Sequence, residues 1–339
     1  MTLRIGIEIN YTDVQNREDN VRLAREAEDL GYDCIWCSEV YTYDAFTTLT
    51  HLACNTSTIK VGTNIAQIYG RTPSMLATTS ASLDQLSGGR FILGVGASGP
   101  QVIEGWHGVP YDKPVARTRE IIEICRMIWS GERLNYQGSV YDLSKHPKMK
   151  ILNHGHRTDI PIFVASLGPK NVEMTAELAD GWLPYPFSTA RGPEVFRASL
   201  EAGKAKRSAG LPPLRIAPFS LVGDEQHGDD AARMVLALYI GGMGSREQNF
   251  YNKLVQRYGF VEEATQIQDL FLGGDKAAAM AAVPQALIDE VSIIGDEARM
   301  KDRLAAFEEA GATDLVVAFM AADGGSRSQM MKTLARANG

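Results

Sequence analysis

Short apolar runs alternate along the chain with longer amphipathic segments. Residues 3–9 (LRIGIEI) are typical of a buried strand. In residues 17–30, by contrast, the apolar positions recur every three to four residues, as on one face of a helix. The same two patterns repeat to the end of the chain. Further strands are expected at 33–38, 58–64, 91–96, 160–166, near 182, at 214–223 and at 314–319, and further helices at 44–54, 73–88, 113–130, 169–179, 193–208 and 295–311.

Counting the alternation gives eight strand–helix units, which predict parallel strands joined by crossover helices. Residues 1–339 are therefore expected to form a single (β/α)8 barrel domain, with insertions at about 131–159 and 229–290. A doubly wound sheet is the competing architecture. That fold usually carries a glycine fingerprint after its first strand, and the segment IEINYTDVQ has none.

Charge and hydropathy narrow the possible partners. The formal net charge is −7, with acids and bases mixed along the whole chain and no basic block, so no nucleic-acid partner is expected. No apolar run reaches the roughly 18 residues that would span a membrane, and MTLRIGIEIN reads as a strand and not as a leader. We expect a cytoplasmic protein that acts on a small molecule and, as barrels with large helical exteriors often do, forms a homodimer.

Cys34 and Cys37 have the C-x-x-C spacing of redox and zinc sites. They lie inside an apolar strand, where a separation of three residues directs the two side chains to opposite faces. No second pair or nearby histidine completes a metal site. Both cysteines are expected in the core, and no metal site is expected.

In a barrel the active site is built where strands end, and this rule selects the candidate residues. A carboxylate within an apolar strand is costly unless it is paired, so Glu8 is either functional or a paired structural acid. Glu39 ends the second strand and is either functional or a surface acid. The other candidates follow the second to fifth strands: Ser38, Asn64, Ile65, Ala66, Gln67, Ser98, Gly99, Gln101, Ser166, Leu167, Gly168, Pro169 and Lys170.

The loop at 166–171 has the features of an anion site. Gly168 permits close approach of a ligand to the backbone, Pro169 suits the first position of a helix, and free N–H groups at the helix start can bind phosphate. A tight turn between strand and helix is the alternative interpretation.

No Ser–His–Asp grouping, metal-spaced histidine pair or catalytic-type cysteine stands out. Trp106 and His107 are possible substrate contacts, although a single loop histidine is more often structural. Hydride transfer needs mainly a cofactor held rigidly in a dry pocket, with few catalytic side chains from the protein. The small number of candidate catalytic side chains in this sequence is consistent with that chemistry.

Several separated motifs resemble the bacterial-luciferase-like superfamily: GIEIN, SEV, VGTNIAQIYGRTP, DQLSGGRFILGVGASGPQVIEGWHGVPYDKP, VASLGPKNVEMTAELADGW and GDEARMKDRLAAFEEAGATDLVV. More narrowly, they resemble its coenzyme F420-dependent branch, which includes methylenetetrahydromethanopterin reductase. The resemblance covers nearly the whole chain.

The resemblance implies a deazaflavin at the carboxyl-terminal mouth of the barrel, with its phosphate on the loop from Ser166 to Asn171. It also implies a non-prolyl cis peptide at Asn64–Ile65 behind the ring, and Ser98 to Gln101 beside it. Glu8 matches the buried acid of the reductases, and Glu39 matches the acid of the family's Ser-Asp-His motif. Glu8 and Glu39 are therefore the expected catalytic residues, and Ser38, Glu39 and the loop residues above are the expected cofactor-binding set.

One departure from the family pattern affects the expected reaction. Several F420-dependent dehydrogenases have a histidine after that acid, where this chain has Val40. A reductase that uses reduced F420 on an activated C=C or C=N acceptor is therefore favoured over an alcohol dehydrogenase. The alternatives are a monooxygenase that uses reduced FMN and a non-catalytic flavin-binding barrel.

Overall fold

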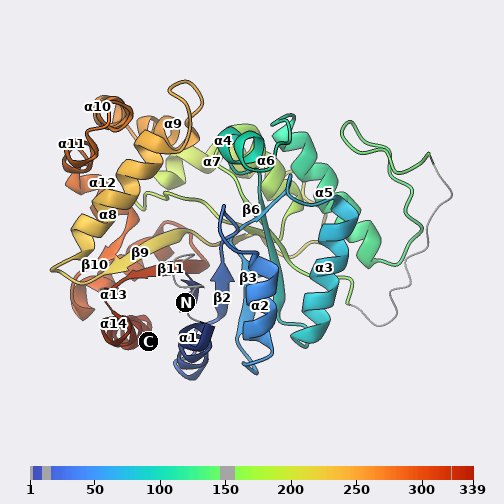
Figure 1. The fold of residues 1–339 in the computed structure, drawn as a ribbon, viewed down its shortest axis with the longest axis horizontal. Coiled ribbons are helices and arrows are strands. Elements are labelled where there is room, and N and C mark those ends of the chain that lie inside the picture. Colours follow the sequence, from blue (N-terminus) through green and yellow to red (C-terminus); the bar gives the residue numbers. More distant parts are fainter. Residues whose placement is uncertain (1–2, 10–16, 146–156, 322) are drawn as a thin grey trace.

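The computed structural model describes residues 3–9, 17–145, 157–321 and 323–339 (Figure 1). Its strands are β1 Arg4–Ile9, β2 Cys34–Cys37, β3 Lys60–Thr63, β4 Ala66–Gln67, β5 Phe91–Gly96, β6 Ile162–Ala165, β7 Gly181–Trp182, β8 Arg215–Ile216, β9 Phe219–Gly223, β10 Ile293–Ile294 and β11 Asp314–Met320. Its helices are α1 Arg17–Asp29, α2 Ala45–Ala53, α3 Pro73–Leu86, α4 Pro100–Gly105, α5 Pro114–Trp129, α6 Pro169–Leu178, α7 Gly192–Lys204, α8 Gly228–Ala237, the π-helix η2 Leu238–Gly242, α9 Phe250–Arg257, α10 Val261–Leu272, α11 Lys276–Ala281, α12 Gln285–Val291, α13 Glu297–Glu309 and α14 Gly324–Asn338.

The strands form one parallel sheet in the order β10-β9-β11-β1-β2-β3-β5-β6-β7-β8. β8 and β9 are consecutive parts of one extended segment, 215–223, which is interrupted at Ala217 and Pro218. β8 pairs with β7, and β9 pairs with β11, so this segment joins the two ends of the sheet. The sheet closes into the expected (β/α)8 barrel, and helices surround it (Figure 1).

The expected elements agree with the observed ones to within a few residues, with two informative differences. The helix expected at 193–208 ends at Lys204, and a turn follows before Pro212 and Pro213. The loop after β5 contains the short helix α4, so Gln101 lies on a helix. Between β9 and β10 the chain forms only helices in the structure, α8 to α12; we call this segment the helical insert (228–291).

Two apolar clusters divide the core. The larger one packs the outer faces of the strands against the helices. The smaller one, inside the barrel, unites side chains from strands all around the ring, including Trp36, Phe163, Leu183 and Val316. Cys34 belongs to the inner cluster and Cys37 to the outer one, so the two cysteines are buried on opposite faces, as expected.

Glycines make room for the large rings inside the barrel. A Cβ atom on Gly6 would lie 2.4 Å from Trp36 Nε1, and one on Gly62 would lie 2.6 Å from the same ring. Trp36 therefore fills the barrel centre between β1 and β3, with Phe163 beside it at 5.7 Å between ring centroids. These rings form the floor beneath the strand ends.

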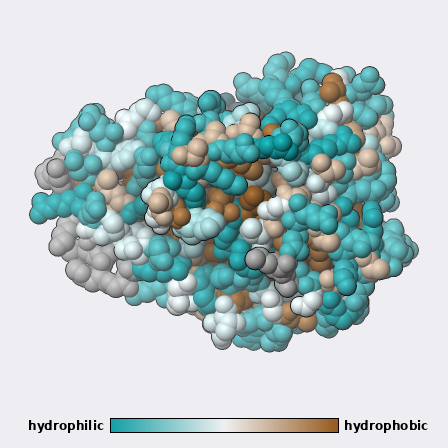
Figure 2. Space-filling model, turned by 180° about the vertical axis from the view of Figure 1, so that it is seen from behind, coloured by the Kyte–Doolittle hydropathy of each residue, from teal (hydrophilic) through white to brown (hydrophobic). Residues whose placement is uncertain are grey.

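The face seen in Figure 2 is mostly hydrophilic, with hydrophobic atoms gathered near its middle. Within the described part of the chain, no helix combines the length and the apolar character needed to cross a membrane.

Candidate active site

Glu8 lies on the inner face of β1, one layer above the aromatic floor. It is paired in register with Trp36, and neighbours in a parallel pair point to the same side of the sheet. The carboxyl group is buried and has two polar neighbours from adjacent strand ends. Ser38 Oγ lies 2.5 Å from Glu8 Oε1, and Asn64 Nδ2 donates to Glu8 Oε2 at 3.0 Å. The structure thus brings together three residues that the strand-end rule had selected separately.

The hydrogen bonds favour a protonated Glu8. Ser38 Oγ also lies 2.9 Å from the Asn64 carbonyl oxygen, but a hydroxyl group has one proton to donate. If Glu8 carries a proton, it donates to Ser38, Ser38 donates to the Asn64 carbonyl, and every acceptor is satisfied. Burial raises the pKa of Glu8 from 4.5 to about 7, although the bonds from Ser38 and Asn64 oppose that rise. Glu8 can therefore hold and release a proton near neutral pH.

Directly beside Glu8, β3 is interrupted and continues as β4. The Asn64–Ile65 peptide bond in this interruption is cis, as the resemblance implied. Ile65 packs against the inner cluster, and a Cβ atom on Gly96 of β5 would lie 2.9 Å from Ile65 Cγ1. Gly96 and the small Ala165 thus leave the Ile65 side chain a defined place at the mouth of the barrel. Ala66 and Gln67 follow in β4 and are buried.

Glu39 lies in a different environment from Glu8. Its carboxylate forms an ion pair with Arg71 at 2.6 Å and accepts a hydrogen bond from the backbone N–H of Gln67 at 3.1 Å. Arg71 also pairs with Asp44 and stacks on Phe46, 4.6 Å from the ring centroid. These contacts tie the end of β2 to the interruption after β3. They suit a positioning role for Glu39, while its predicted catalytic role stays a prediction.

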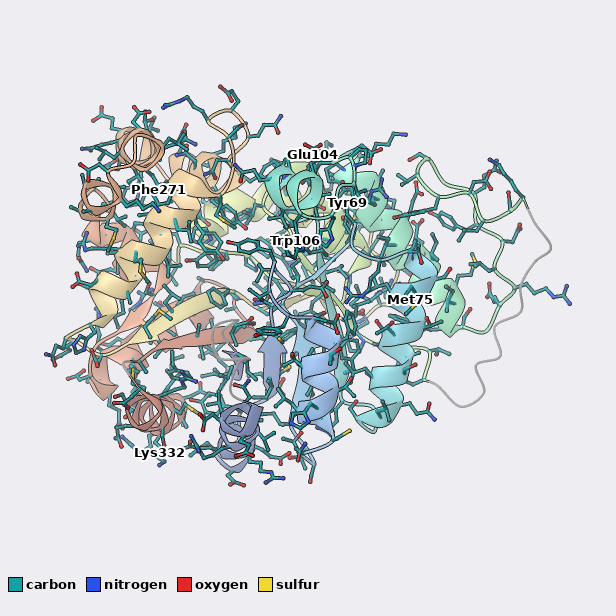
Figure 3. All side chains as sticks on the ribbon, viewed as in Figure 1. Tyr69, Met75, Glu104, Trp106, Phe271 and Lys332 are labelled. Atoms are coloured by element: carbon teal, nitrogen blue, oxygen red, sulfur yellow. The ribbon has the colours of Figure 1, made fainter. Side chains whose placement is uncertain are left out.

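The loop after β5 and the helix α4 lie above the interruption after β3. His107 Nε2 hydrogen-bonds to Gln67 Oε1, and so this histidine contacts a residue that is predicted to bind the cofactor. Trp106 is exposed at the end of α4, and Figure 3 shows it and Tyr69 at the same end of the molecule. Ser98 has a positive φ of 56°, and its carbonyl accepts from the Tyr111 hydroxyl at 3.4 Å.

Gly99 and Gln101 begin α4. A Cβ atom on Gly99 would meet nothing within 4 Å, and Gln101 is exposed. Both positions are therefore open for contact with a ligand, and their predicted role in cofactor binding stays a prediction.

The loop after β6 forms the start of α6. Gly168 is the N-cap residue of α6 and, as a glycine, has no side chain that could cap the helix. Its φ of −72° is ordinary for any residue, and a Cβ atom there would meet nothing within 4 Å. What glycine provides here is open space in front of the first helical turn. In that turn Pro169 has no N–H group, and the Asn171 and Val172 N–H groups donate to the Gly168 carbonyl at 3.0 and 2.9 Å. Pro169 and Lys170 are exposed, and Lys170 pairs with Glu173 at 3.2 Å.

Hydrogen bonds from α6, from β7 and from the helical insert hold Ser166 and Leu167 in place. The Ser166 hydroxyl hydrogen-bonds to Thr175 at 2.8 Å, and the Ser166 carbonyl accepts from Trp182 at 2.8 Å. Arg257 of α9 donates to the Leu167 carbonyl at 3.2 Å, which brings a cation to this loop. The buried Asn171 Oδ1 has no partner among the described residues.

Sequence reasoning missed Arg71, Arg257 and Tyr185. Arg257 lies one helical turn beyond Lys253 on α9. Two other cations of this region do not reach the loop after β6, since Arg246 contacts Asp269 and Lys253 donates to the Glu247 carbonyl. Tyr185 lies three residues beyond the end of β7, so the strand-end rule extended to the loop after the sixth strand would have found it. No sequence signal connects Arg71 with Glu39, because their pairing depends on the loop after β4.

Other surfaces offer weaker candidates. A groove of about 720 Å³ runs between α1 and the end of α2, lined by Arg22, Arg25, Glu26, Asp29 and His51 among others. It lies outside the barrel and includes none of the predicted site residues. Among the described residues, no group of three or more His, Cys, Asp and Glu could hold a metal ion.

Comparison with known proteins gives a consistent result. Residues 3–314 match the family model described as luciferase-like monooxygenase. A putative coenzyme F420-dependent oxidoreductase of Mycobacterium tuberculosis is 35% identical, with 93% of this chain and 94% of the relative covered. The 5,10-methylenetetrahydromethanopterin reductase of Archaeoglobus fulgidus is 30% identical, with 86% of each chain covered.

Among solved structures, the coenzyme F420-dependent tetrahydromethanopterin reductase from Methanopyrus kandleri superposes with a TM-score of 0.81 at 26% identity. The similarity covers 99% of this chain and 98% of that one. The fold, the arrangement at the strand ends and the match along nearly the entire length agree. The chain belongs to the luciferase-like monooxygenase family.

Proposed function

We propose that this protein is a coenzyme F420-dependent oxidoreductase that works as a reductase on a small organic substrate. The observation that carries the proposal is the buried Glu8–Ser38–Asn64 network, which holds a proton beside Ile65 at the barrel mouth. Relatives at 35% and 30% identity bear the names of an F420-dependent oxidoreductase and a reductase, which supports the same activity.

The residues present fit the proposed cofactor. Ile65 offers an apolar surface for a flat ring, and Gly96 beneath it cannot gain a side chain without moving Ile65. The open space at Gly168, the first turn of α6 and the unpartnered Asn171 Oδ1 suit a phosphate-bearing chain with hydroxyl groups. Ser38, Glu39, Asn64, Ala66, Gln67, Ser98, Gly99 and Gln101 would surround the ring, and Ser166 to Lys170 would hold the phosphate.

The deazaflavin, when bound, supplies or accepts the hydride. Glu8 would provide the accompanying proton to the substrate, and Ser38 and Asn64 would keep its carboxyl group oriented. Glu39, fixed by Arg71, would position the β2 end and the Gln67 backbone. Val40 leaves no imidazole next to Glu39, so Glu8 is the acid that the described mouth residues best supply. The aromatic floor excludes water from below.

A monooxygenase that uses reduced FMN is the second candidate, because the matching family model carries that description. Both candidates use the same fold and the same mouth. The homodimer and the cytoplasmic location stay predictions.

Titration of the purified protein with F420 and FMN, each oxidised and reduced, distinguishes the two candidates. We expect F420 to bind at least tenfold more tightly than FMN, and reduced F420 to be oxidised by an unsaturated acceptor. Tighter FMN binding, with turnover that consumes O2, would replace the reductase with the monooxygenase.

Replacing Gly168 with Asp is expected to separate the stability of α6 from cofactor affinity. An aspartate in place of glycine at an N-cap position stabilises a helix by roughly a few tenths of a kcal/mol, so the melting temperature should stay level or rise slightly. The same carboxylate would face the phosphate group and should weaken F420 binding by at least tenfold. Gly168→Ser is the matched control, since it caps the helix without a charge. Unchanged F420 affinity in the Asp variant would place the phosphate elsewhere.

A further inference from the structure

Tyr185 is a partly buried residue at the barrel mouth that the mechanism above does not use. Leu183, which follows β7, belongs to the inner cluster. Tyr185 lies two residues further along, where the chain bends, and packs against the larger cluster. Its ring packs edge-to-face on Phe219, also at the inner cluster, with 5.0 Å between centroids. Tyr185 therefore lies beyond the carboxyl end of β7, at the mouth and beside the inner cluster, on the side of the barrel opposite to β2 and β3.

The Tyr185 hydroxyl group is buried and has no hydrogen-bond partner among the described residues. Leaving a buried polar group unpaired costs about 1–3 kcal/mol. Other buried tyrosines avoid this cost: the hydroxyl of Tyr258 donates to the Pro186 carbonyl at 2.9 Å, and that of Tyr32 donates to the Met331 carbonyl at 2.8 Å. Tyr185 differs from them because it lies beyond the carboxyl end of β7, where a ligand in the mouth would supply the missing partner.

The helical insert adds two more rings to Tyr185. Tyr239 packs edge-to-face on Tyr185 at 4.9 Å, and Tyr251 packs edge-to-face on Tyr239 at 4.8 Å. We call Tyr185, Tyr239 and Tyr251 the aromatic wall. Tyr239 belongs to η2 and Tyr251 to α9, so the wall joins the insert to the barrel. Figure 1 shows α9 at the end of the molecule toward which β2 points, which is the mouth.

The insert is built to hold this wall in place. Cβ atoms on Gly241 and Gly242 would each lie 2.4 Å from Phe271 of α10, so both glycines are needed for Phe271 to pack against the π-helix. Figure 3 shows Phe271 on the side of the molecule that the insert forms. Asn249 donates to the carbonyl oxygens of Tyr239 and Ile240 at 3.0 and 2.9 Å. A π-helix often marks a functional site, and this one fixes Tyr239 over Tyr185.

The surroundings of the hydroxyl group define what it can bind. Burial, followed by the nearby Tyr251, raises the pKa of Tyr185, and no charged side chain contributes to that rise. The phenol is therefore a neutral donor in neutral, aromatic surroundings. A charged or polyhydroxylated group would lose its hydration there without gaining enough partners. A flat ring with a carbonyl or ring-nitrogen acceptor would pack on the wall and satisfy the hydroxyl group.

We propose that the aromatic wall is the specificity-determining surface of the substrate chamber, and that the Tyr185 hydroxyl donates a hydrogen bond to a flat, neutral, conjugated substrate. This proposal rests on the reductase function, because that function places the substrate in the mouth. Glu8 and Tyr185 would then act on the substrate from different strands: Glu8 supplies the proton, and Tyr185 selects and orients the ring.

The test compares Tyr185→Phe with the matched control Tyr258→Phe. Three neutral probes are measured by equilibrium dialysis, with and without F420: chromone, which is flat, conjugated and has a carbonyl acceptor; naphthalene, which is flat without an acceptor; and cyclohexanone, which has an acceptor but is not flat. The melting temperature of each ligand-free protein and its affinity for F420 are measured alongside.

We expect Tyr185→Phe to weaken chromone binding roughly tenfold, the effect of one lost hydrogen bond, and to leave naphthalene binding and F420 affinity unchanged. Its melting temperature should not fall, because the hydroxyl group has no partner to lose. Tyr258→Phe should lower the melting temperature, since it loses the bond to Pro186, and should bind chromone like the wild type.

Equal chromone affinity in the wild type and Tyr185→Phe would overturn the proposal. So would cyclohexanone binding as tightly as chromone, or a fall in melting temperature in Tyr185→Phe equal to that in Tyr258→Phe. The two proposals fail separately. If F420 does not bind but the chromone pattern holds, the reductase function is wrong and the wall stands. If F420 binds and the chromone pattern is absent, the wall alone is wrong.

Discussion

Replacing Glu8 with Gln is expected to lower turnover by roughly two to four orders of magnitude, the usual contribution of a positioned general acid. Gln is isosteric with the protonated acid: its amide can donate to Ser38 and accept from Asn64, so the network survives. F420 affinity should therefore change by less than about threefold. The measurement is steady-state oxidation of reduced F420 over a range of pH, together with the cofactor titration.

The pH dependence identifies Glu8 more specifically than the loss of rate does. Since burial raises its pKa from 4.5 to about 7, wild-type activity should decline above pH 7, and the residual activity of Glu8→Gln should lack that ionisation. Stability follows from the same shift. The folded state holds the proton more tightly than the unfolded state, so wild-type stability falls as pH rises from 4.5 to 7, by about 3 kcal/mol.

Glu8→Gln cannot ionise and should not show this decline. The variant should therefore become more stable than the wild type above pH 7 in urea-unfolding experiments. Parallel stability curves for the two proteins between pH 5 and 8 would mean that Glu8 is already ionised in the folded protein. A proton donor other than Glu8 would then be needed.

Replacing Gly94 with Ala is expected to give the largest loss of stability. A Cβ atom there would lie 1.8 Å from the Thr63 carbonyl oxygen, and backbone oxygen cannot move without separating β3 from β5. Thr63 and Gly94 also exchange hydrogen bonds, with the Thr63 hydroxyl donating to the Gly94 carbonyl at 2.7 Å. We expect a loss of about 3 kcal/mol or more in the free energy of unfolding, measured by urea denaturation.

Gly96→Ala is the control for this effect, because it lies on the same strand two residues further on. Its Cβ atom would meet the Ile65 side chain, with Cγ1 at 2.9 Å and Cδ1 at 3.0 Å, and a side chain can shift more easily than backbone, so the protein should fold with a loss of about 1 kcal/mol. Displaced Ile65 would instead disturb the cofactor surface and weaken F420 binding. Equal stability of the Gly94→Ala variant and the wild type would show that β3 and β5 are not packed as closely as described.

The fold was largely predictable because its signals are local and repeated. Strands such as 91–96 and helices such as 114–129 follow from hydrophobic periodicity. The regular alternation of strands and helices then limits the sheet to parallel topologies. The break at Ala217 and Pro218 and the helix α4 were not predicted, because a short interruption or a six-residue helix leaves little periodic signal.

The candidate site was predictable to the extent that it follows the chain. Parallel strands place their carboxyl ends at one end of the barrel, so the positions of Glu8, Ser38 and Asn64 along the sequence were enough to select them. Their roles depend on contacts between strands. Glu8 is bonded to neutral groups and has a raised pKa, whereas Glu39 is paired with Arg71. Two acids that look alike in sequence therefore differ in chemistry.

The sequence by itself determined the strand–helix order, the barrel, the two buried cysteines on opposite faces and the set of strand ends that form the mouth. These depend on periodicity and chain direction, which are properties of neighbouring residues. The tertiary structure alone decided which acid can hold a proton, how Trp36 fills the centre between Gly6 and Gly62, and that Tyr239 and Tyr251 of the insert extend Tyr185 into a wall. Burial and pairing between residues far apart in sequence set pKa values and leave a hydroxyl group unpartnered, and no local pattern encodes them.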